Sequence, residues 1–275
     1  MFGRLFKRKN ADSKRGGYSA STPEDVRIYA IGDVHGRLDL LRDLVDKIIE
    51  DAQSAGSASI KVVFLGDYVD RGMDSCGVIN LLIADPFPDF DTIYLKGNHE
   101  KAILDFLKDP AFGTTWKYYG GLETLHSYGL TEALAATTAE DFVDVAQEFR
   151  DVLPEQHVSF LSNLPTKATI GDYCFVHAGM RPGIPLDRQV DEDMLWIRDT
   201  FLSSKHDFGK IIVHGHTPTE TPVLARNRIG IDTGAYMTGV LTALVLEGED
   251  YRFLQTGHAA REANGETRVK IKAIG

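Results

Sequence analysis

Groups that can bind metals or transfer protons occur in five short clusters along the sequence. They lie in GDVHGR (32–37), GDYVDRG (66–72), GNHE (97–100), HAG (177–179) and HGHTP (214–218). Each follows an apolar run and contains a glycine, which allows a sharp turn and leaves room for an ion or a substrate. Any one cluster alone would be an ordinary turn or helix cap. All five together indicate one shared site.

The donors in these clusters are carboxylates, imidazoles and one amide oxygen. This mixture suits borderline divalent ions such as Mn, Fe or Zn, whereas thiolate sites and all-oxygen calcium sites use other donors. More donors converge than one tetrahedral ion can use. Two metals about 3.5–4 Å apart that share a bridging carboxylate would use them.

The elements that must position these groups are short strands alternating with helices. The strand-like runs are 26–33, 61–67, 92–98, 173–179, 210–216, 228–234 and 241–248. Apolar residues recur at helical spacing between Leu38 and Ile49 and, more briefly, between Val78 and Leu82. This order predicts an α/β core with one mixed sheet or two packed sheets.

Residues 110–165 interrupt the series of strands. Their pattern is helical and aromatic, so we predict a helical cap inserted between the early and late strands. The expected domains are a basic tail over 1–24, a catalytic domain over 25–258 that includes the cap, and a C-terminal extension over 259–275.

Composition restricts the class of protein. The chain has 275 residues, is 43% hydrophobic and carries a formal net charge of −10, which argues against a broad nucleic-acid surface. No apolar run reaches the ~18 residues of a membrane span. Two cysteines are too few for a disulfide framework and suit a reducing, cytoplasmic compartment. We interpret the basic N-terminus as a disordered tail, with weak contact to a membrane surface as the alternative.

The ordered set GDxHG, GDxxDRG, GNHE, HAG and GHTP resembles the calcineurin-like metallophosphoesterases. Within them it is most similar to the phosphoprotein phosphatase branch, especially its bacterial and bacteriophage serine/threonine phosphatases. The resemblance implies a core of two packed mixed β-sheets flanked by helices. HAG and GHTP differ from the eukaryotic motifs, so the regulatory subunits of those enzymes are not carried over.

The resemblance also implies two divalent ions per chain, most readily Mn, with Fe or Zn as alternatives. The six implied ligands are Asp33, His35, Asp67, Asn98, His177 and His216. The first two would hold one ion, Asp67 would bridge, and the last three would complete the second. His214, two residues before His216, stays an alternative for the last ligand.

Four further residues receive roles in catalysis from the resemblance. His99 would be the general acid for the leaving oxygen, oriented by Asp70. Arg71 and Arg198 would bind the phosphate together with His99, because a guanidinium can hold two phosphoryl oxygens at once.

Three residues keep an alternative interpretation. Arg198 could instead form a surface salt bridge with Asp193 or Asp199. Glu100 is expected to favour the first turn of a helix through the macrodipole, with a partner outside that helix as the alternative. Asp232 is expected to be a buried turn carboxylate rather than a ligand.

The implied activity is a metal-dependent phosphomonoesterase that acts on protein phosphoserine or phosphothreonine, with phosphotyrosine as a further substrate. A metal-bound hydroxide would attack phosphorus in line. Pro218 stands where many diesterases of the superfamily have a second histidine, which favours monoesters. The alternative enzyme is a symmetrical dinucleotide polyphosphate hydrolase, and the remote alternative is a non-catalytic regulatory module on a phosphatase core.

Overall fold

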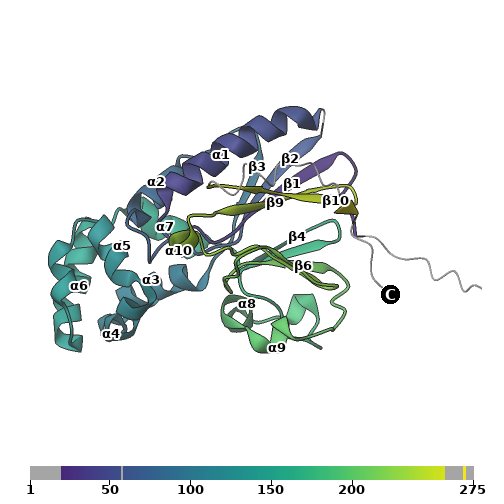
Figure 1. Cartoon of the computed structure of the whole chain (residues 1–275). Helices are drawn as coiled ribbons and strands as arrows, with labels where there is room; N and C mark the ends of the chain where they lie inside the picture. Colours follow the sequence, from purple (N-terminus) through teal and green to yellow (C-terminus); the bar gives the residue numbers. More distant parts are fainter. Residues whose placement is uncertain (1–19, 57, 258–268, 271–275) are drawn as a thin grey trace, which may run out of the picture.

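Two β-sheets pack face to face, and helices cover their outer faces (Figure 1). The computed structural model of the chain describes residues 20–56, 58–257 and 269–270. Residues 1–19 of the tail predicted over 1–24 therefore lie outside the described residues, as does the extension predicted over 259–275 except for Val269 and Lys270. The predicted α/β fold with two packed mixed sheets is confirmed.

The first sheet has six strands in the order β11-β10-β9-β1-β2-β3. They are β1 (Val26–Ile31), β2 (Ser59–Phe64), β3 (Asp91–Tyr94), β9 (Thr242–Glu247), β10 (Asp250–Gln255) and β11 (Val269–Lys270). β1, β2 and β3 are parallel, so their carboxyl ends lie at one edge of the sheet. β9, β10 and β11 extend the sheet by antiparallel pairing. The sequence patterns predicted neither β10 nor β11.

The second sheet has the order β4-β5-β6-β8-β7. Its strands are β4 (Lys167–Ile170), β5 (Tyr173–Val176), β6 (Ile211–His214), β7 (Val223–Leu224) and β8 (Arg228–Gly230). β5, β6 and β8 are parallel, and the edge strands β4 and β7 are antiparallel to their neighbours. The sequence analysis missed both edge strands, which are short and only partly buried.

Side chains of the central strand β1 alternate between two hydrophobic clusters, one on each face of the sheet. Ile28 and Ala30 belong to the cluster between the sheets, which also contains Phe175 of β5. Tyr29 and Ile31 belong to the cluster beneath the helices. Because successive strand residues point to opposite faces, β1 is apolar at every position from Ile28 to Ile31, where both of its faces are covered.

Helices fill the space outside the sheets. The α-helices are α1 (Leu38–Ala52), α2 (Ser75–Ile83), α3 (Asn98–Lys108), α4 (Gly113–Trp116), α5 (Gly121–Ser127), α6 (Ala139–Val152), α7 (Glu155–Asn163), α8 (Asp191–Trp196), α9 (Asp199–Leu202) and α10 (Ala235–Thr238). Short 3-10 turns are η1 (Gln53–Ala55), η2 (Pro110–Phe112), η3 (Lys117–Tyr119), η4 (Thr131–Ala135) and η5 (Leu186–Arg188). In α1 the predicted apolar face is buried except for Ile49, which is 41% exposed. No helix in the described ranges is long and apolar enough to cross a membrane.

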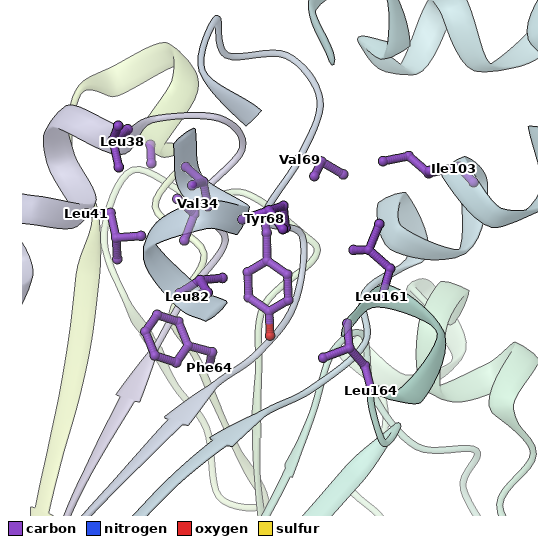
Figure 2. Close-up of a cluster of buried hydrophobic side chains, with 14 of the residues drawn as sticks. Val34, Leu38, Leu41, Phe64, Tyr68, Val69, Leu82, Ile103, Leu161 and Leu164 are labelled. Carbon is purple, nitrogen blue, oxygen red and sulfur yellow. The ribbon is translucent and has the colours of Figure 1, made fainter. Parts of the chain in front are cut away.

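The loop after β2 is anchored in the core beneath the helices. Figure 2 shows Tyr68 and Val69 of this loop among buried side chains from several helices. Both are fully buried, and the Tyr68 hydroxyl donates a hydrogen bond of 2.6 Å to the carbonyl of Leu95. Asp67 and Asp70 flank these two anchors, so the hydrophobic core fixes where both carboxylates emerge.

The segment predicted as a cap is helical throughout, from η2 to α7. Trp116, Phe142 and Phe149 of this segment belong to the same hydrophobic cluster as Phe106 of α3. The cap therefore packs directly on α3, the helix whose first turn contains Asn98, His99 and Glu100. The division of the chain into a tail, a catalytic domain that includes the cap and a C-terminal extension stays a prediction.

Candidate active site

Eight polar residues from five loops meet where the parallel strands of both sheets end. All are at most 5% exposed: Asp33, His35, Asp67, Asp70, Asn98, His99, His177 and His216. Each lies within six residues after a strand, as the five sequence clusters predicted. Burying so many polar groups is costly unless they bind one another or an ion.

Asp67 is the hub of this site. Its Oδ2 lies 3.5 Å from His35 Nε2, 3.3 Å from His177 Nε2 and 3.8 Å from His99 Nε2. Two groups of donor atoms lie within 4.8 Å of one another, His35–Asp67–His99 and Asp67–His177–His216. Because Asp67 belongs to both, the arrangement fits two ions that share one carboxylate.

The remaining proposed ligands lie beside the second group. His177 Nε2 is 2.8 Å from Asn98 Oδ1 and 3.2 Å from His216 Nδ1. Asp33 Oδ2 accepts a hydrogen bond of 2.9 Å from the backbone N–H of His216. The structure thus brings together all six residues that the sequence analysis proposed as metal ligands.

The chemistry of these atoms fits divalent ions. Asp33 Oδ1 and His216 Nε2 are buried and have no hydrogen-bond partner in the described part of the chain. Leaving a buried polar atom unsatisfied costs about 1–3 kcal/mol, so such atoms indicate a missing partner. Gly215 and Gly97 provide the room, since a Cβ at either would collide with Asp33 or Asp67 Oδ1.

The charge states of the histidines differ across the site. Burial, together with the neighbouring His99, lowers the pKa of His35 to about 3. Burial and His177 lower the pKa of His216 to about 2, and neutral imidazole is the form that binds metals. Burial alone would lower the pKa of His177 too, but Asp67 raises it to about 9. At this position a metal would compete with a proton.

Backbone strain is concentrated in the same loops. Seven non-glycine residues in the described ranges have positive φ, and five of them are at this site: His35, Asp67, Asp70, Arg71 and His216. Such conformations cost about 1–3 kcal/mol each and persist only where surrounding contacts impose them. The strain is a second, independent indication that these loops form a functional site.

Comparison with known proteins agrees with this geometry. The sequence profile of the family described as calcineurin-like phosphoesterase matches residues 26–258. The chain belongs to this family. The match includes all five clusters and confirms the predicted superfamily. Members of this superfamily are phosphoester hydrolases that use divalent metals.

Curated relatives cover most of this phosphoesterase. Two of them are named bis(5'-nucleosyl)-tetraphosphatase PrpE (asymmetrical). The protein from Oceanobacillus iheyensis is 26% identical over 79% of this chain and 88% of its own length. The protein from Halalkalibacterium halodurans is 28% identical over 78% of this chain and 87% of its own length.

Solved structures share the fold of this phosphoesterase. A candidate diadenosine tetraphosphatase has a TM-score of 0.58 at 21% identity and covers 88% of this chain and 100% of its own. A cold-active protein tyrosine phosphatase has a TM-score of 0.56 at 18% identity, with coverage of 86% and 81%. At these identities the likeness concerns the fold alone.

The GNHE cluster of the phosphoesterase lies in the first turn of α3, because β3 ends at Tyr94 rather than near residue 98. Successive helical side chains diverge, so each of the three polar residues has its own target. Asn98 contacts His177, and His99 Nδ1 lies 2.7 Å from Asp70 Oδ2. Burial opposes a charge on His99, yet Asp67 and Asp70 raise its pKa, as suits a proton donor.

Glu100 joins two of the loops. Its fully buried carboxylate accepts hydrogen bonds from the backbone N–H groups of Gly97 at 2.7 Å, Asp67 at 2.9 Å and Tyr68 at 2.7 Å. The contact with Gly97 caps the first turn of α3 by a hydrogen bond, whereas the preferred sequence interpretation expected an effect on this turn through the macrodipole. The contacts with Asp67 and Tyr68 lie outside the helix, so Glu100 also has the partner outside α3 that the alternative interpretation expected.

The two histidines of HGHTP have different surroundings. His214 ends β6, where its ring packs 5.1 Å from Phe201 and burial lowers its pKa to about 4. It belongs to neither group of metal-capable residues in the described part of the chain. His216 lies past the strand at φ 67° and faces His177. This difference favours His216 as the last ligand.

The two arginines also differ. Arg71 is half-buried, and its guanidinium lies 4.7 Å from the centre of the Tyr236 ring. Arg198 is exposed, and its charge contributes to the low pKa of His216. Asp193, one of its two suggested salt-bridge partners, is instead paired with Arg181. No ion pair joins Arg198 to Asp199 within the described ranges.

Sequence reasoning missed three half-buried aromatic residues around the site. Tyr119 lies 6.2 Å from His99, Trp196 lies 6.3 Å from His216, and Tyr236 lies 5.5 Å from His35, between ring centroids. They come from η3, α8 and α10, and no sequence spacing connects them. The only available hint was proximity to a motif, such as Trp196 two residues before Arg198.

Proposed function

We propose that this phosphoesterase hydrolyses dinucleoside polyphosphates. The observation that carries the proposal is the set of relatives named bis(5'-nucleosyl)-tetraphosphatase, two of which match 79% and 78% of this chain. The three aromatic residues beside the buried site support it, because they provide flat surfaces for nucleobases next to the phosphate-binding groups. The alternative from the sequence analysis thus becomes the main hypothesis, ahead of a phosphoprotein phosphatase.

The metal ligands, the two arginines and His99 have separate roles in this reaction. Two divalent ions held by the six proposed ligands would supply Lewis acidity and activate water at neutral pH. Arg71 and Arg198 bind the phosphoryl oxygens at the site of attack. Water supplies the new oxygen on phosphorus, the bond to the bridging oxygen breaks, and His99 Nε2 donates a proton to the leaving oxygen while Asp70 holds Nδ1.

We further propose Mn as the native metal, with Fe or Zn as alternatives, because mixed carboxylate, amide and imidazole donors suit these borderline divalent ions. A cytoplasmic location also stays our proposal. It rests on the two cysteines, Cys76 and Cys174, both of which are free thiols.

A panel of substrates in one Mn-containing buffer tests this function. We expect kcat/KM for bis(5'-adenosyl) tetraphosphate to exceed that for any phosphoserine, phosphothreonine or phosphotyrosine peptide by at least ~10²-fold, about 2.7 kcal/mol of transition-state stabilisation. We expect p-nitrophenyl phosphate to exceed bis(p-nitrophenyl) phosphate by a similar factor, because Pro218 adds no further metal ligand.

The products of the tetraphosphate define the cleavage site. AMP with ATP would show asymmetrical cleavage, and two ADP would show the symmetrical cleavage considered in the sequence analysis. A higher kcat/KM for a phosphopeptide than for the dinucleotide would favour the phosphoprotein phosphatase hypothesis instead. An Asp67→Asn preparation serves as the control for contaminating phosphatases.

The arginines give a second prediction. Arg71→Lys keeps the charge but removes the forked donor, so we expect kcat/KM to fall by about 10-fold, or about 1.4 kcal/mol, and inhibition by phosphate to weaken. Arg198→Lys is expected to do the same. Arg181→Lys is the matched control, because its partner Asp193 lies outside the proposed ligand set. Unchanged kinetics in Arg198→Lys would make Arg198 a surface residue.

A further inference from the structure

The carboxylate of Asp70 is held mainly from outside the catalytic loops. It is fully buried and accepts three side-chain hydrogen bonds. His99 Nδ1 lies 2.7 Å and Trp116 Nε1 2.9 Å from Oδ2, while Thr124 Oγ1 donates to Oδ1 at 2.6 Å. Only His99 belongs to a motif cluster, since Trp116 ends α4 and Thr124 lies in α5 of the cap.

The cap also holds the backbone of the same loop. The N–H of Asp70 donates to Thr124 Oγ1 at 2.9 Å, and the N–H of Arg71 donates to the carbonyl of Gly120 at 3.1 Å. Asp70 and Arg71 are adjacent non-glycine residues with φ of 69° and 68°. Two consecutive left-handed residues are unfavourable on their own, so external contacts must impose this turn.

Packing fixes the indole that makes one of these contacts. Trp116 is fully buried, with its ring 4.8 Å from Phe106 of α3 and 6.3 Å from Phe149 of α6. Gly121 is needed beside it, since a Cβ there would collide with the indole. The indole N–H is therefore aimed at Asp70 by the same packing that attaches the cap to α3.

We propose that the helical cap positions the Asp70–His99 pair, with Trp116 and Thr124 as the positioning residues. The proposal rests on the acid role of His99 stated under the proposed function, but not on the identity of the natural substrate. Hydrogen bonds from Trp116 and Thr124 fix the orientation of the Asp70 carboxylate. The carboxylate in turn fixes the orientation of the His99 ring through Nδ1. A displacement of about 1 Å of a catalytic group can cost 10²-fold in rate, so removal of one donor has a kinetic effect without touching substrate.

The test uses Trp116→Phe and Thr124→Val, which keep most of the volume and remove one donor each. For an alkyl ester such as glycerol phosphate we expect kcat to fall by ~10–10²-fold. For p-nitrophenyl phosphate we expect a smaller fall, because its leaving group needs less protonation. KM and metal content should stay near wild type. In a His99→Asn background the same substitutions should have little further effect, because they act through His99.

Two variants of the cap control for a merely structural effect. Val145→Ala removes buried volume from α6 of the cap but no donor, and Thr114→Val removes a cap hydroxyl whose one hydrogen bond in the described part of the chain is to the Ala111 carbonyl. The Tm of each control is measured beside that of wild type, and both controls should leave the alkyl-to-aryl rate ratio unchanged. The proposal is overturned if Trp116→Phe and Thr124→Val change Tm alone, or if their kinetic losses are equal for both esters and persist in the His99→Asn background. The substrate panel decides the proposed function separately, since these generic esters report on positioning whichever substrate is natural.

Discussion

Replacement of Asp67 by asparagine is expected to abolish turnover and to lower the metal content of the chain. Asp67 is the one residue shared by both metal-capable groups in the described ranges, and three histidines lie within 3.8 Å of its Oδ2. Burial alone would raise its pKa, but His177 and His99 hold that pKa well below its usual range, so the side chain is an anion at neutral pH. An amide supplies neither the charge nor a second anionic oxygen. We expect a loss of at least ~10³-fold in kcat/KM, about 4 kcal/mol.

The measurement is metal per chain by elemental analysis, together with hydrolysis of p-nitrophenyl phosphate. Asp232→Asn is the matched control, since Asp232 is also a buried carboxylate near the site but accepts its hydrogen bond from its own turn, at Gly234. This control should keep its metal. An Asp67→Asn protein with two ions per chain and near-normal activity would overturn the dinuclear assignment.

Replacement of His99 by asparagine is expected to remove most of kcat while metal occupancy stays close to wild type. His99 Nδ1 is bound by Asp70, which leaves Nε2 to face the cluster around Asp67. Loss of a general acid typically costs ~10²–10⁴-fold. The loss should be largest for alkyl phosphates. It should be smaller for aryl phosphates and for dinucleoside polyphosphates, whose leaving groups are weaker bases.

Two results would assign His99 differently. Loss of an ion in His99→Asn would make His99 a ligand, as its place in the group with His35 and Asp67 permits. Equal losses for alkyl and aryl phosphates would argue against proton donation.

Local sequence patterns were enough to locate the strand ends that carry the polar groups of the site. Asp33, Asp67, Asn98, His177 and His216 each follow an apolar run, and a glycine neighbours each in sequence or within two residues. Such patterns are local, because a strand end and the turn after it depend on a few adjacent residues. Convergence of these ends followed from the fold class, since parallel strands present their carboxyl ends at one edge.

Which polar groups contact one another depends on the packing of the folded chain. His214 and His216 share a face if a strand continues through both, and only the end of β6 at His214 and the positive φ of His216 separate their surroundings. Trp116 and Thr124 lie 46 and 54 positions from Asp70, and the cap must pack on α3 before either can bond its carboxylate. Hydrogen bonds between residues so distant in sequence leave no periodic pattern, because their partners are set by the packing of whole helices rather than by neighbouring residues.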